Sequence, residues 1–265
     1  MTTSAEASLA LMLKTLRLPS IASHFSQVAS QAEREGWSFG QYLKELCEVE
    51  VNDRNERRTA RLLKQSELPS DKTLATLDAK RLPSSISKRL PTLCEGSFVD
   101  RAENVLVFGL PGRGKSHLVC AIGHELVRAG RQVLFVPTYK LVQQLLAAKR
   151  DLKLDRELKR LDRFEVIILD DIGYVQQERD EMEVLFTFLA ERYERGSVMI
   201  TSNLVFSQWD RIFKDAMTTA AAIDRLVHHS IILEANCGSF REEHAKNSLA
   251  QQTTTTTTIR QKNAG

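Results

Sequence analysis

The sequence predicts an α/β protein in which a small all-helical region precedes a sheet covered by helices on both faces. From residue 104 onward, short apolar and β-branched runs alternate with helical stretches. Before residue 67, apolar residues recur at helical spacing, and the β-branched runs that a sheet needs are missing. Because continuous apolar strands are typical of parallel sheets buried on both faces, we expect a three-layer domain with five mostly parallel strands.

Three helices are expected in the first 66 residues. Leu9 to Leu16 carry apolar residues at helical spacing, and Pro19 ends that segment. A second helix is expected from Ile21 to about Glu35, where Gly36 breaks it. A third begins after Ser38 and carries one apolar stripe of Tyr42, Leu43, Leu46 and Val49.

Changes in composition divide the chain into four parts. We expect an N-terminal helical domain (1–66), a proline-containing connector with some helix (67–103), an α/β domain (104–240) and a C-terminal tail (241–265). The tail contains a low-complexity threonine run and is expected to be largely disordered. The expected strands are 105–108, 132–136, 165–169, 197–201 and 230–233.

Composition places the chain among soluble globular proteins. It has 265 residues, of which 42% are hydrophobic and 27% charged, and a net charge of +3 that is too small to indicate a nucleic-acid partner alone. Four widely spaced cysteines form no zinc or disulfide pattern. No run approaches the length of a membrane span, and no signal peptide is recognised. We therefore expect a cytoplasmic protein with no membrane partner.

The glycine-rich loop predicts a nucleoside triphosphate site. Residues 109–116 read Gly-Leu-Pro-Gly-Arg-Gly-Lys-Ser and fit G-x-x-x-x-G-K-[ST], between a strand-like run and a helix. Backbone N–H groups of such a loop surround phosphates, Lys115 reaches the β- and γ-phosphates, and the Ser116 hydroxyl is placed to bind Mg²⁺. The expected ATP-binding residues are Gly109, Leu110, Pro111, Gly112, Arg113, Gly114, Lys115, Ser116 and His117.

Two carboxylates follow the third expected strand. Asp170 and Asp171 end the apolar run 166–169, and the carboxyl edge of a parallel sheet is where ligands bind in open α/β folds. We expect Asp170 to hold Mg²⁺, directly or through water, and Asp171 to act as the general base on the attacking water.

Two further residues have both a functional and a structural interpretation. Asn203 follows the fourth strand and either orients the attacking water or caps a helix near Phe206. Arg225 either pairs with Asp224 or another acid, or supplies a cation to the γ-phosphate of an adjacent subunit. The predicted catalytic residues are Lys115, Asp171, Asn203 and Arg225.

With the loop, the Asp-Asp strand, Thr-Ser-Asn203 and Ile-Asp-Arg225 in this order, the chain resembles the AAA+ ATPases. Within them it is similar to the IstB-like helpers of bacterial insertion-sequence transposition, which are close to the DnaC helicase loaders. Three segments outside the core carry the same resemblance: Glu48 to Lys64, Leu68 to Leu74 and Gly238 to Arg241. The resemblance therefore covers about residues 8–245.

The resemblance implies a P-loop AAA+ domain that hydrolyses ATP with Mg²⁺, self-associates and binds double-stranded DNA to assist a separate transposase. It implies that the helper does not itself cut or join strands. Alternatives are a DnaC-like replicative helicase loader and a nucleotide-gated DNA scaffold with incidental hydrolysis. Asp171 departs from the longer Glu of many AAA+ proteins, so hydrolysis could be slow.

Two basic clusters are candidates for contact with DNA. The first spaces its cations along one side of the third helix, where phosphate contacts need them in a row. Its alternative is a solvated face that pairs with Glu45, Glu48 and Glu50. The second, in residues 149–163, has seven cations offset by four acids and could face the channel of a ring or spiral. The predicted DNA-binding residues are Arg54, Arg57, Arg58, Arg61 and Lys64.

Overall fold

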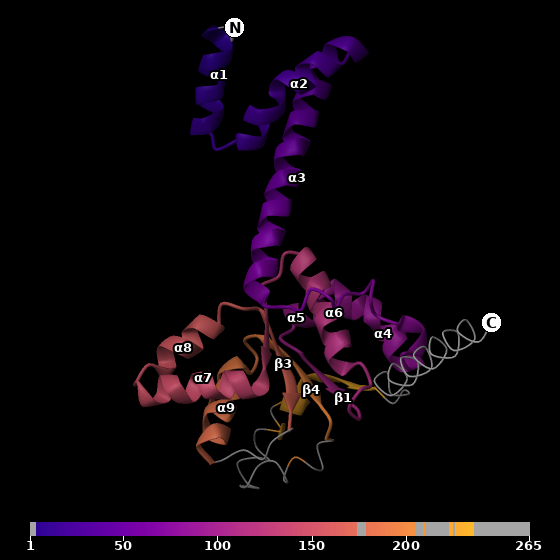
Figure 1. Cartoon of the computed structure of the whole chain (residues 1–265), viewed down its shortest axis with the longest axis vertical. Coiled ribbons are helices and arrows are strands. Elements are labelled where there is room, and N and C mark those ends of the chain that lie inside the picture. The colour runs from indigo at the N-terminus through magenta and orange to yellow at the C-terminus, as the bar shows by residue number, and fades with distance from the viewer. Residues whose placement is uncertain (1–3, 174–178, 205–208, 210–222, 225, 236–265) are drawn as a thin grey trace, which may run out of the picture. The chain divides into compact units, whose positions relative to one another are not determined.

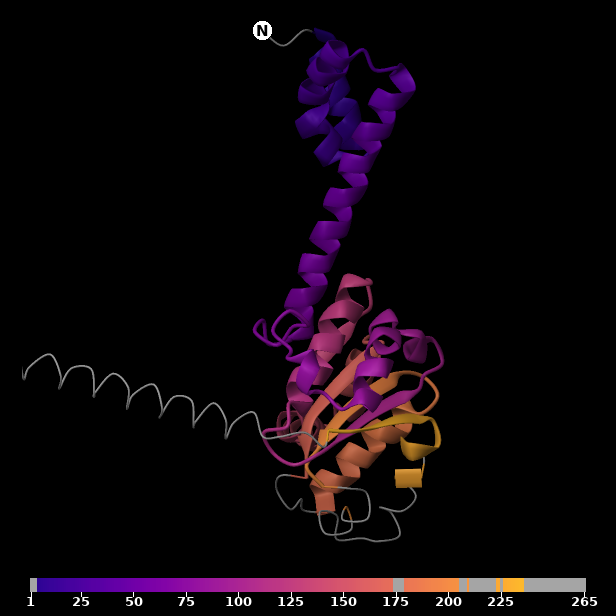
Figure 2. The same ribbon diagram turned by 90° about the vertical axis from the view of Figure 1, so that its right-hand side faces the viewer.

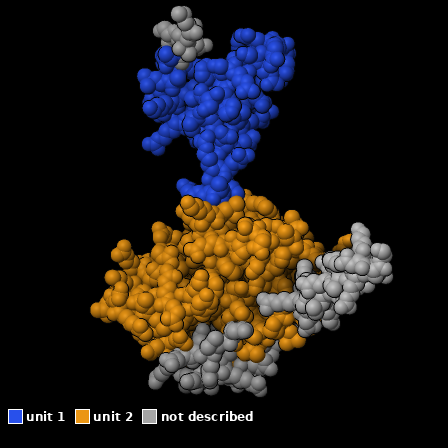
Figure 3. Space-filling view, in the orientation of Figure 1, with its two compact units in different colours: residues 1–61 blue, residues 62–265 orange. Residues whose placement is uncertain are grey.

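The computed structural model of the chain describes residues 4–173, 179–204, 209, 223–224 and 226–235 (Figure 1). It divides into two compact units, Met1–Arg61 and Leu62–Gly265 (Figure 3). Three predictions fall outside the described residues: the position of Arg225, a helix near Phe206 and the disorder of the C-terminal tail.

The first unit contains the three expected helices. They are α1 (Ser4–Thr15), α2 (Pro19–Glu35) and α3 (Phe39–Ser66), whose last residues belong to the second unit. α2 ends at Gly36, which has the left-handed φ of 66° that glycine adopts without strain. The buried centre of the unit is formed by Leu13, Ile21, Val28 and Leu46.

α2 begins without a capping side chain of its own. Pro19 occupies its first turn, and Leu18 before it makes no side-chain cap. Instead, the Glu50 carboxylate of α3 accepts hydrogen bonds from the N–H groups of Ser20 (2.8 Å) and Ile21 (3.1 Å). A buried carboxylate at a helix N-terminus is favourable because it satisfies unpaired donors and the helix dipole. Glu50 therefore joins α2 to α3.

The second unit is built on a five-stranded sheet in which every neighbouring pair is parallel, as predicted. The strand order is β2-β3-β4-β1-β5. The strands are β1 (Asn104–Phe108), β2 (Val133–Pro137), β3 (Val166–Ile172), β4 (Ser197–Ser202) and β5 (Ser230–Glu234). Along the described chain, the helices of this unit are η1 (Ala79–Arg81), α4 (Ser84–Glu95), α5 (Ser97–Asp100), α6 (Lys115–Arg128), α7 (Thr138–Arg150), α8 (Leu154–Leu161) and α9 (Arg179–Arg192).

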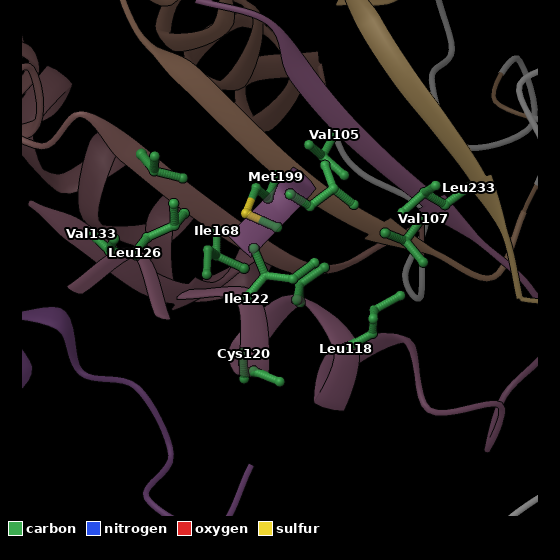
Figure 4. Packing of buried hydrophobic residues seen from close by; sticks show 14 of the residues in the cluster. Val105, Val107, Leu118, Cys120, Ile122, Leu126, Val133, Ile168, Met199 and Leu233 are labelled. Atoms are coloured by element: carbon green, nitrogen blue, oxygen red, sulfur yellow. The ribbon is translucent and has the colours of Figure 1, made fainter. Parts of the chain in front are cut away.

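Helices cover both faces of the sheet (Figures 1 and 2). Alternate residues of β1 enter two separate cores: Val105 and Val107 pack with α6, whereas Leu106 and Phe108 pack with α7 and α9. Figure 4 shows the α6 face, with Ile122 beside Ile168 of β3. Burying one such aliphatic side chain contributes about 1.5–3 kcal/mol. The three-layer prediction is therefore confirmed.

Residues 67–103 pack on the sheet domain. Leu77, Leu82, Ile86, Leu93 and Phe98 are buried in the same core as α6. The segment predicted as a connector therefore contributes side chains to this core. Among the described residues, no helix is both long and apolar enough to cross a membrane.

Candidate nucleotide site

The glycine-rich loop borders a pocket of about 460 Å³ in the second unit. The pocket lies where β1, β3 and β4 end, and residues of the segment before α4 close its other side. From the loop and the strand ends come Pro111, Gly112, Arg113, Gly114, Lys115, Ser116, His117, Asp171 and Asn203; from the segment before α4 come Lys72, Thr76, Leu77, Asp78, Arg81 and Leu82.

Two glycines of the loop are required by its backbone path. Gly114 is the N-cap residue of α6 and has a left-handed φ of 80°, which glycine adopts without strain. The unpaired N–H groups of the first turn of α6 therefore come directly after the loop. At Gly109, a Cβ atom would lie 2.7 Å from the carbonyl oxygen of Ala235. Lys115 is the first residue of α6 and is only 8% exposed, and its Nζ donates to the carbonyl of Leu110 at 3.1 Å. The loop is thus arranged to surround an anion.

A bulge in β3 gives Asp170 and Asp171 different surroundings. The pairing of β3 with β4 shifts register between Leu169 and Ile172, and Asp171 has a left-handed φ of 65°. Asp171 is exposed and lines the pocket, whereas Asp170 is only partly exposed. The Thr138 hydroxyl donates to the Asp170 carbonyl at 3.0 Å, so β3 is also fixed to the start of α7.

Thr201 of β4 connects both aspartates, a contact that the sequence alone did not predict. Its hydroxyl donates to Oδ1 of Asp170 at 2.7 Å and accepts the backbone N–H of Asp171 at 2.8 Å. Thr201 is fully buried, and both hydrogen bonds are partly shielded from solvent. The hydrogen bond from the Asp171 N–H to Thr201 stabilises the left-handed backbone conformation of Asp171. That conformation costs a non-glycine residue of order 1 kcal/mol or more.

Asn203 lies at the end of β4 and lines the pocket, as expected from its position in the sequence. Its Oδ1 atom is buried and accepts no hydrogen bond from any described residue. A buried carbonyl oxygen without a donor is costly, and a bound water or ligand N–H or O–H would satisfy it. The alternative, a cap on a helix near Phe206, lies outside the described residues.

The connector takes part in the pocket, which its sequence did not predict. Nε2 of His117, the residue after Ser116, lies 3.1 Å from the Thr76 hydroxyl and 3.2 Å from the Thr73 carbonyl. About two turns further along α6, Nε2 of His124 lies 2.9 Å from the Pro69 carbonyl. The only feature of the sequence that pointed to the connector was the segment Leu68 to Leu74, which belongs to the family resemblance. These contacts fix the connector beside the phosphate loop.

The residues present fit a nucleoside triphosphate with Mg²⁺. The glycine loop, the start of α6 and Lys115 offer N–H groups and a cation for phosphates, and the orphaned Asn203 oxygen offers an acceptor. Ser116 and Asp170 carry the oxygen ligands that Mg²⁺ prefers. Among the described residues, no three His, Cys, Asp or Glu side chains gather into a metal site.

The described cysteines do not belong to the chemistry of the pocket. Cys47, Cys94 and Cys120 are free thiols, and Cys237 lies outside the described residues. Burial is the main cause that raises the pKa of Cys120 to about 12 and the pKa of Cys94 to about 11. Both thiols therefore stay protonated near neutral pH and are poor nucleophiles and metal ligands.

The predicted DNA-binding stripe lies on one helix, α3, but two of its cations bind within the first unit. Arg54 donates to Glu50 at 2.9 Å and to the Arg17 carbonyl at 2.5 Å. Arg57 donates to the Ser20 hydroxyl at 2.9 Å and to Asp53 at 3.2 Å. These bonds fit the structural alternative for these two residues, and their role in DNA binding stays a prediction.

Known proteins are similar to this chain in sequence and in fold. The profile of the IstB-like ATP binding protein family matches residues 11–248. An insertion-sequence ATP-binding protein of Sinorhizobium fredii is 43% identical over 241 residues, or 91% of this chain and 81% of that protein. The IS21 insertion-sequence ATP-binding protein of Pseudomonas aeruginosa is 36% identical over 248 residues, or 93% and 94% of the two chains.

Solved structures agree with the fold. The replication initiator DnaA bound to AMPPCP and single-stranded DNA gives a TM-score of 0.55 at 15% identity, covering 70% of this chain and 56% of that one. The crystal structure of DnaI gives 0.52 at 21% identity, covering 63% and 94%. At such identities the likeness concerns the fold alone, and it confirms the predicted α/β fold around a five-stranded parallel sheet.

Proposed function

The chain belongs to the family of IstB-like ATP-binding proteins, and we propose that it is an ATP-hydrolysing helper of a transposase that assembles on double-stranded DNA. The observation that carries the proposal is that one pocket brings together the glycine-rich loop, Asp171 and Asn203. The names of the relatives, which are insertion-sequence ATP-binding proteins, support a role in the movement of such an element. The strand-transfer chemistry is left to the transposase.

In this proposal, each polar residue of the pocket has one task. The loop amides and Lys115 bind the phosphates. Ser116 and Asp170 would hold Mg²⁺, which would supply positive charge against the phosphate oxygens. Asp171 accepts a proton from the attacking water, which Asn203 orients through its unpaired Oδ1 atom. The products are ADP and phosphate. The base of the nucleotide lies against the connector, where Leu77 and Leu82 supply apolar surface.

The hydrolytic site is completed by self-association. Arg225 of one subunit supplies a cation to the γ-phosphate bound by its neighbour, which lowers the barrier by neutralising charge that develops in the transition state. ATP binding thereby favours an oligomer on DNA, and hydrolysis releases it. The stripe of Arg54, Arg57, Arg58, Arg61 and Lys64 on α3 is one proposed contact with the DNA backbone.

Two substitutions in the full chain test the proposal. Lys115→Ala is expected to abolish ATP binding, measured by titration with a fluorescent ATP analogue. Asp171→Asn is expected to bind ATP normally and to lose at least about tenfold in phosphate release. Lys140→Ala, a change at an exposed lysine of α7 that does not line the pocket, serves as the control. ATP hydrolysis that persists in Lys115→Ala would contradict the site.

A second candidate, the nucleotide-gated scaffold, is favoured by one observation. Residue 171 is an aspartate, one methylene shorter than the glutamate of many AAA+ proteins, so its carboxylate reaches less far into the pocket that it lines. If ATP binding alone drives function, Asp171→Asn retains both ATP-dependent assembly on DNA and support of transposition. If hydrolysis is required, this variant assembles on DNA and fails to support transposition.

A further inference from the structure

We propose that Asn104 is a positioning residue for Arg225, the cation that completes the nucleotide site of a neighbouring subunit. This inference rests on the shared site of the proposed function and goes beyond it, because it names the contact that holds the segment around the arginine. Arg225 itself lies outside the described residues, whereas Asp224 before it and Leu226 after it are described.

Asn104 is the first residue of β1, and both ends of its side-chain amide are used. Nδ2 donates to the carbonyl oxygen of Leu226 at 3.2 Å, and Oδ1 accepts the backbone N–H of Val198 in β4 at 2.9 Å. The backbone N–H of Asn104 donates to the carbonyl oxygen of His229 at 2.7 Å. The side chain is only 8% exposed, so losing it would leave buried polar groups without partners. Asn104 therefore joins the first residues of β1 and β4 to the segment 226–229.

Leu226 is also fixed on its apolar side. Its side chain is 4% exposed and belongs to the core that α7 and α9 form on one face of the sheet. Ile223 and Val227 pack against the same core. Apolar packing is not directional, whereas a hydrogen bond to a carbonyl oxygen is. The bond from Asn104 therefore sets the orientation of the backbone beside Arg225.

Two other polar contacts of the segment lie at the surface. The Tyr193 hydroxyl is 3.3 Å from Nδ1 of His228, and Nε2 of His229 is 3.7 Å from an oxygen of Glu194. Exposed pairs of this kind contribute little, because water competes for both partners. The buried bond from Asn104 is therefore a stronger constraint on the segment than either of these contacts.

Asn104 lies at the end of the sheet opposite to the nucleotide pocket of its own chain. The pocket lies where the parallel strands end, whereas Asn104 begins β1 and does not line the pocket. The four residue steps from Asn104 to Phe108 span about 13 Å. A change at Asn104 is thus expected to leave the phosphate ligands of its own chain in place. Its effect on hydrolysis is expected in the pocket of the neighbour that receives Arg225.

The test is subunit mixing with the full-length variant Asn104→Ala. Alone, this variant is expected to bind ATP within about threefold of the wild type and to lose at least about tenfold in phosphate release, because a misplacement of about 1 Å can cost about 100-fold. Mixed with Lys115→Ala, whose Arg225 is intact and correctly held, it is expected to regain part of the activity. Mixed with Arg225→Ala it is expected to regain none, because neither chain then supplies a placed arginine.

Ser197→Ala is the matched control. Ser197 is the first residue of β4 and is buried, and its Oγ atom bonds to no described residue. This variant is expected to hydrolyse ATP like the wild type.

A second variant separates the two side-chain bonds of Asn104. Asn104→Asp keeps an oxygen for the Val198 N–H but loses the donor to the Leu226 carbonyl. It is expected to show the same mixing pattern as Asn104→Ala. Its amide hydrogen exchange is expected to be faster at residues 226–229 and unchanged at residues 105–108. Wild-type hydrolysis or unchanged exchange at 226–229 in Asn104→Asp would overturn the role of the Leu226 contact.

The mixtures also separate failure of this inference from failure of the proposed function. If Lys115→Ala restores activity to Arg225→Ala but not to Asn104→Ala, Asn104 does not position the arginine. Activity regained by mixing Asn104→Ala with Arg225→Ala would likewise overturn the inference, since Asn104 would then act independently of the donated arginine. If Lys115→Ala and Arg225→Ala regain no activity together, the shared site of the proposed function itself fails.

Discussion

At the scale of single residues, Thr201 is the side chain on which the geometry of both aspartates depends. We expect Thr201→Val to keep ATP affinity within about threefold and to lower the turnover rate by about tenfold or more, because one tenfold step corresponds to about 1.4 kcal/mol. Valine has the same shape but neither donates to Asp170 nor accepts the Asp171 N–H. Phosphate release and nucleotide titration measure the two quantities.

Thr201→Ser provides the matched control, since it keeps the hydroxyl and removes only a methyl group. It should recover most of the turnover. An equal loss in the valine and serine variants, or a loss of ATP binding in both, would show that Thr201 acts only through packing.

Glu50 gives the first unit a predictable dependence on pH. Burial raises the pKa of the Glu50 carboxyl, but hydrogen bonds from Ile21, Arg54 and Ser20 outweigh burial and hold the pKa below its ordinary value. A carboxyl with a lowered folded pKa adds stability that is complete above its unfolded pKa and is lost as pH falls through the folded value. Amide hydrogen exchange of residues 19–35 should therefore become faster as pH falls below about 4.5, relative to the intrinsic rate.

Glu50→Gln should weaken the protection of α2 at neutral pH by about 1–2 kcal/mol and respond less to acid. Glu48→Gln is the control, because Glu48 forms only an exposed pair with Lys44, and such pairs contribute little. A Glu50→Gln variant with the same acid response as the wild type would contradict this role.

At the scale of elements, the connector controls the shape of the nucleotide pocket from outside it. His124 holds the Pro69 carbonyl but does not line the pocket, so His124→Ala removes one attachment without altering any phosphate ligand. We expect ATP affinity to fall by about three- to tenfold, the equivalent of one hydrogen bond of about 0.5–1.5 kcal/mol. Titration with the fluorescent analogue measures the change.

His228→Ala is the comparison variant, because His228 is exposed and does not line this pocket. Its ATP affinity should equal that of the wild type. If His124→Ala also binds ATP normally, the connector does not shape the pocket through this contact.

The five strands were predictable because each is an apolar run of strand length, and all five expected ranges agree with β1–β5 within a few residues. The loop and Asp170–Asp171 were predictable for a related reason: their chemistry follows from local spacing. Thr201, His124 and the contact of His117 with the connector were not predictable, because the partners are about 30 to 55 residues away in the sequence. The bulge at Asp171 also depends on pairing with β4. Such contacts are decided by tertiary register, which composition and periodicity do not encode.

At the scale of the whole molecule, the central question is whether one chain contains a complete hydrolytic site. The described pocket holds the phosphate loop, Asp171 and Asn203, and its described lining contributes Arg81 and Arg113 as the arginines. In the proposed oligomer, the neighbour's Arg225 is a further cation at the γ-phosphate. ATPase activity per chain should therefore rise with protein concentration and with added DNA.

A mixing experiment tests the shared site directly. Lys115→Ala and Arg225→Ala should each be nearly inactive alone. When they are mixed, a subunit with Arg225→Ala still has an intact loop, and a Lys115→Ala neighbour supplies the arginine to it, so part of the activity returns. A mixture of Lys115→Ala with Asp171→Asn is the control, because that pair leaves no site with both an intact loop and an intact base. If Arg225 acts within its own chain, neither mixture regains activity, and hydrolysis would then be a property of the single subunit.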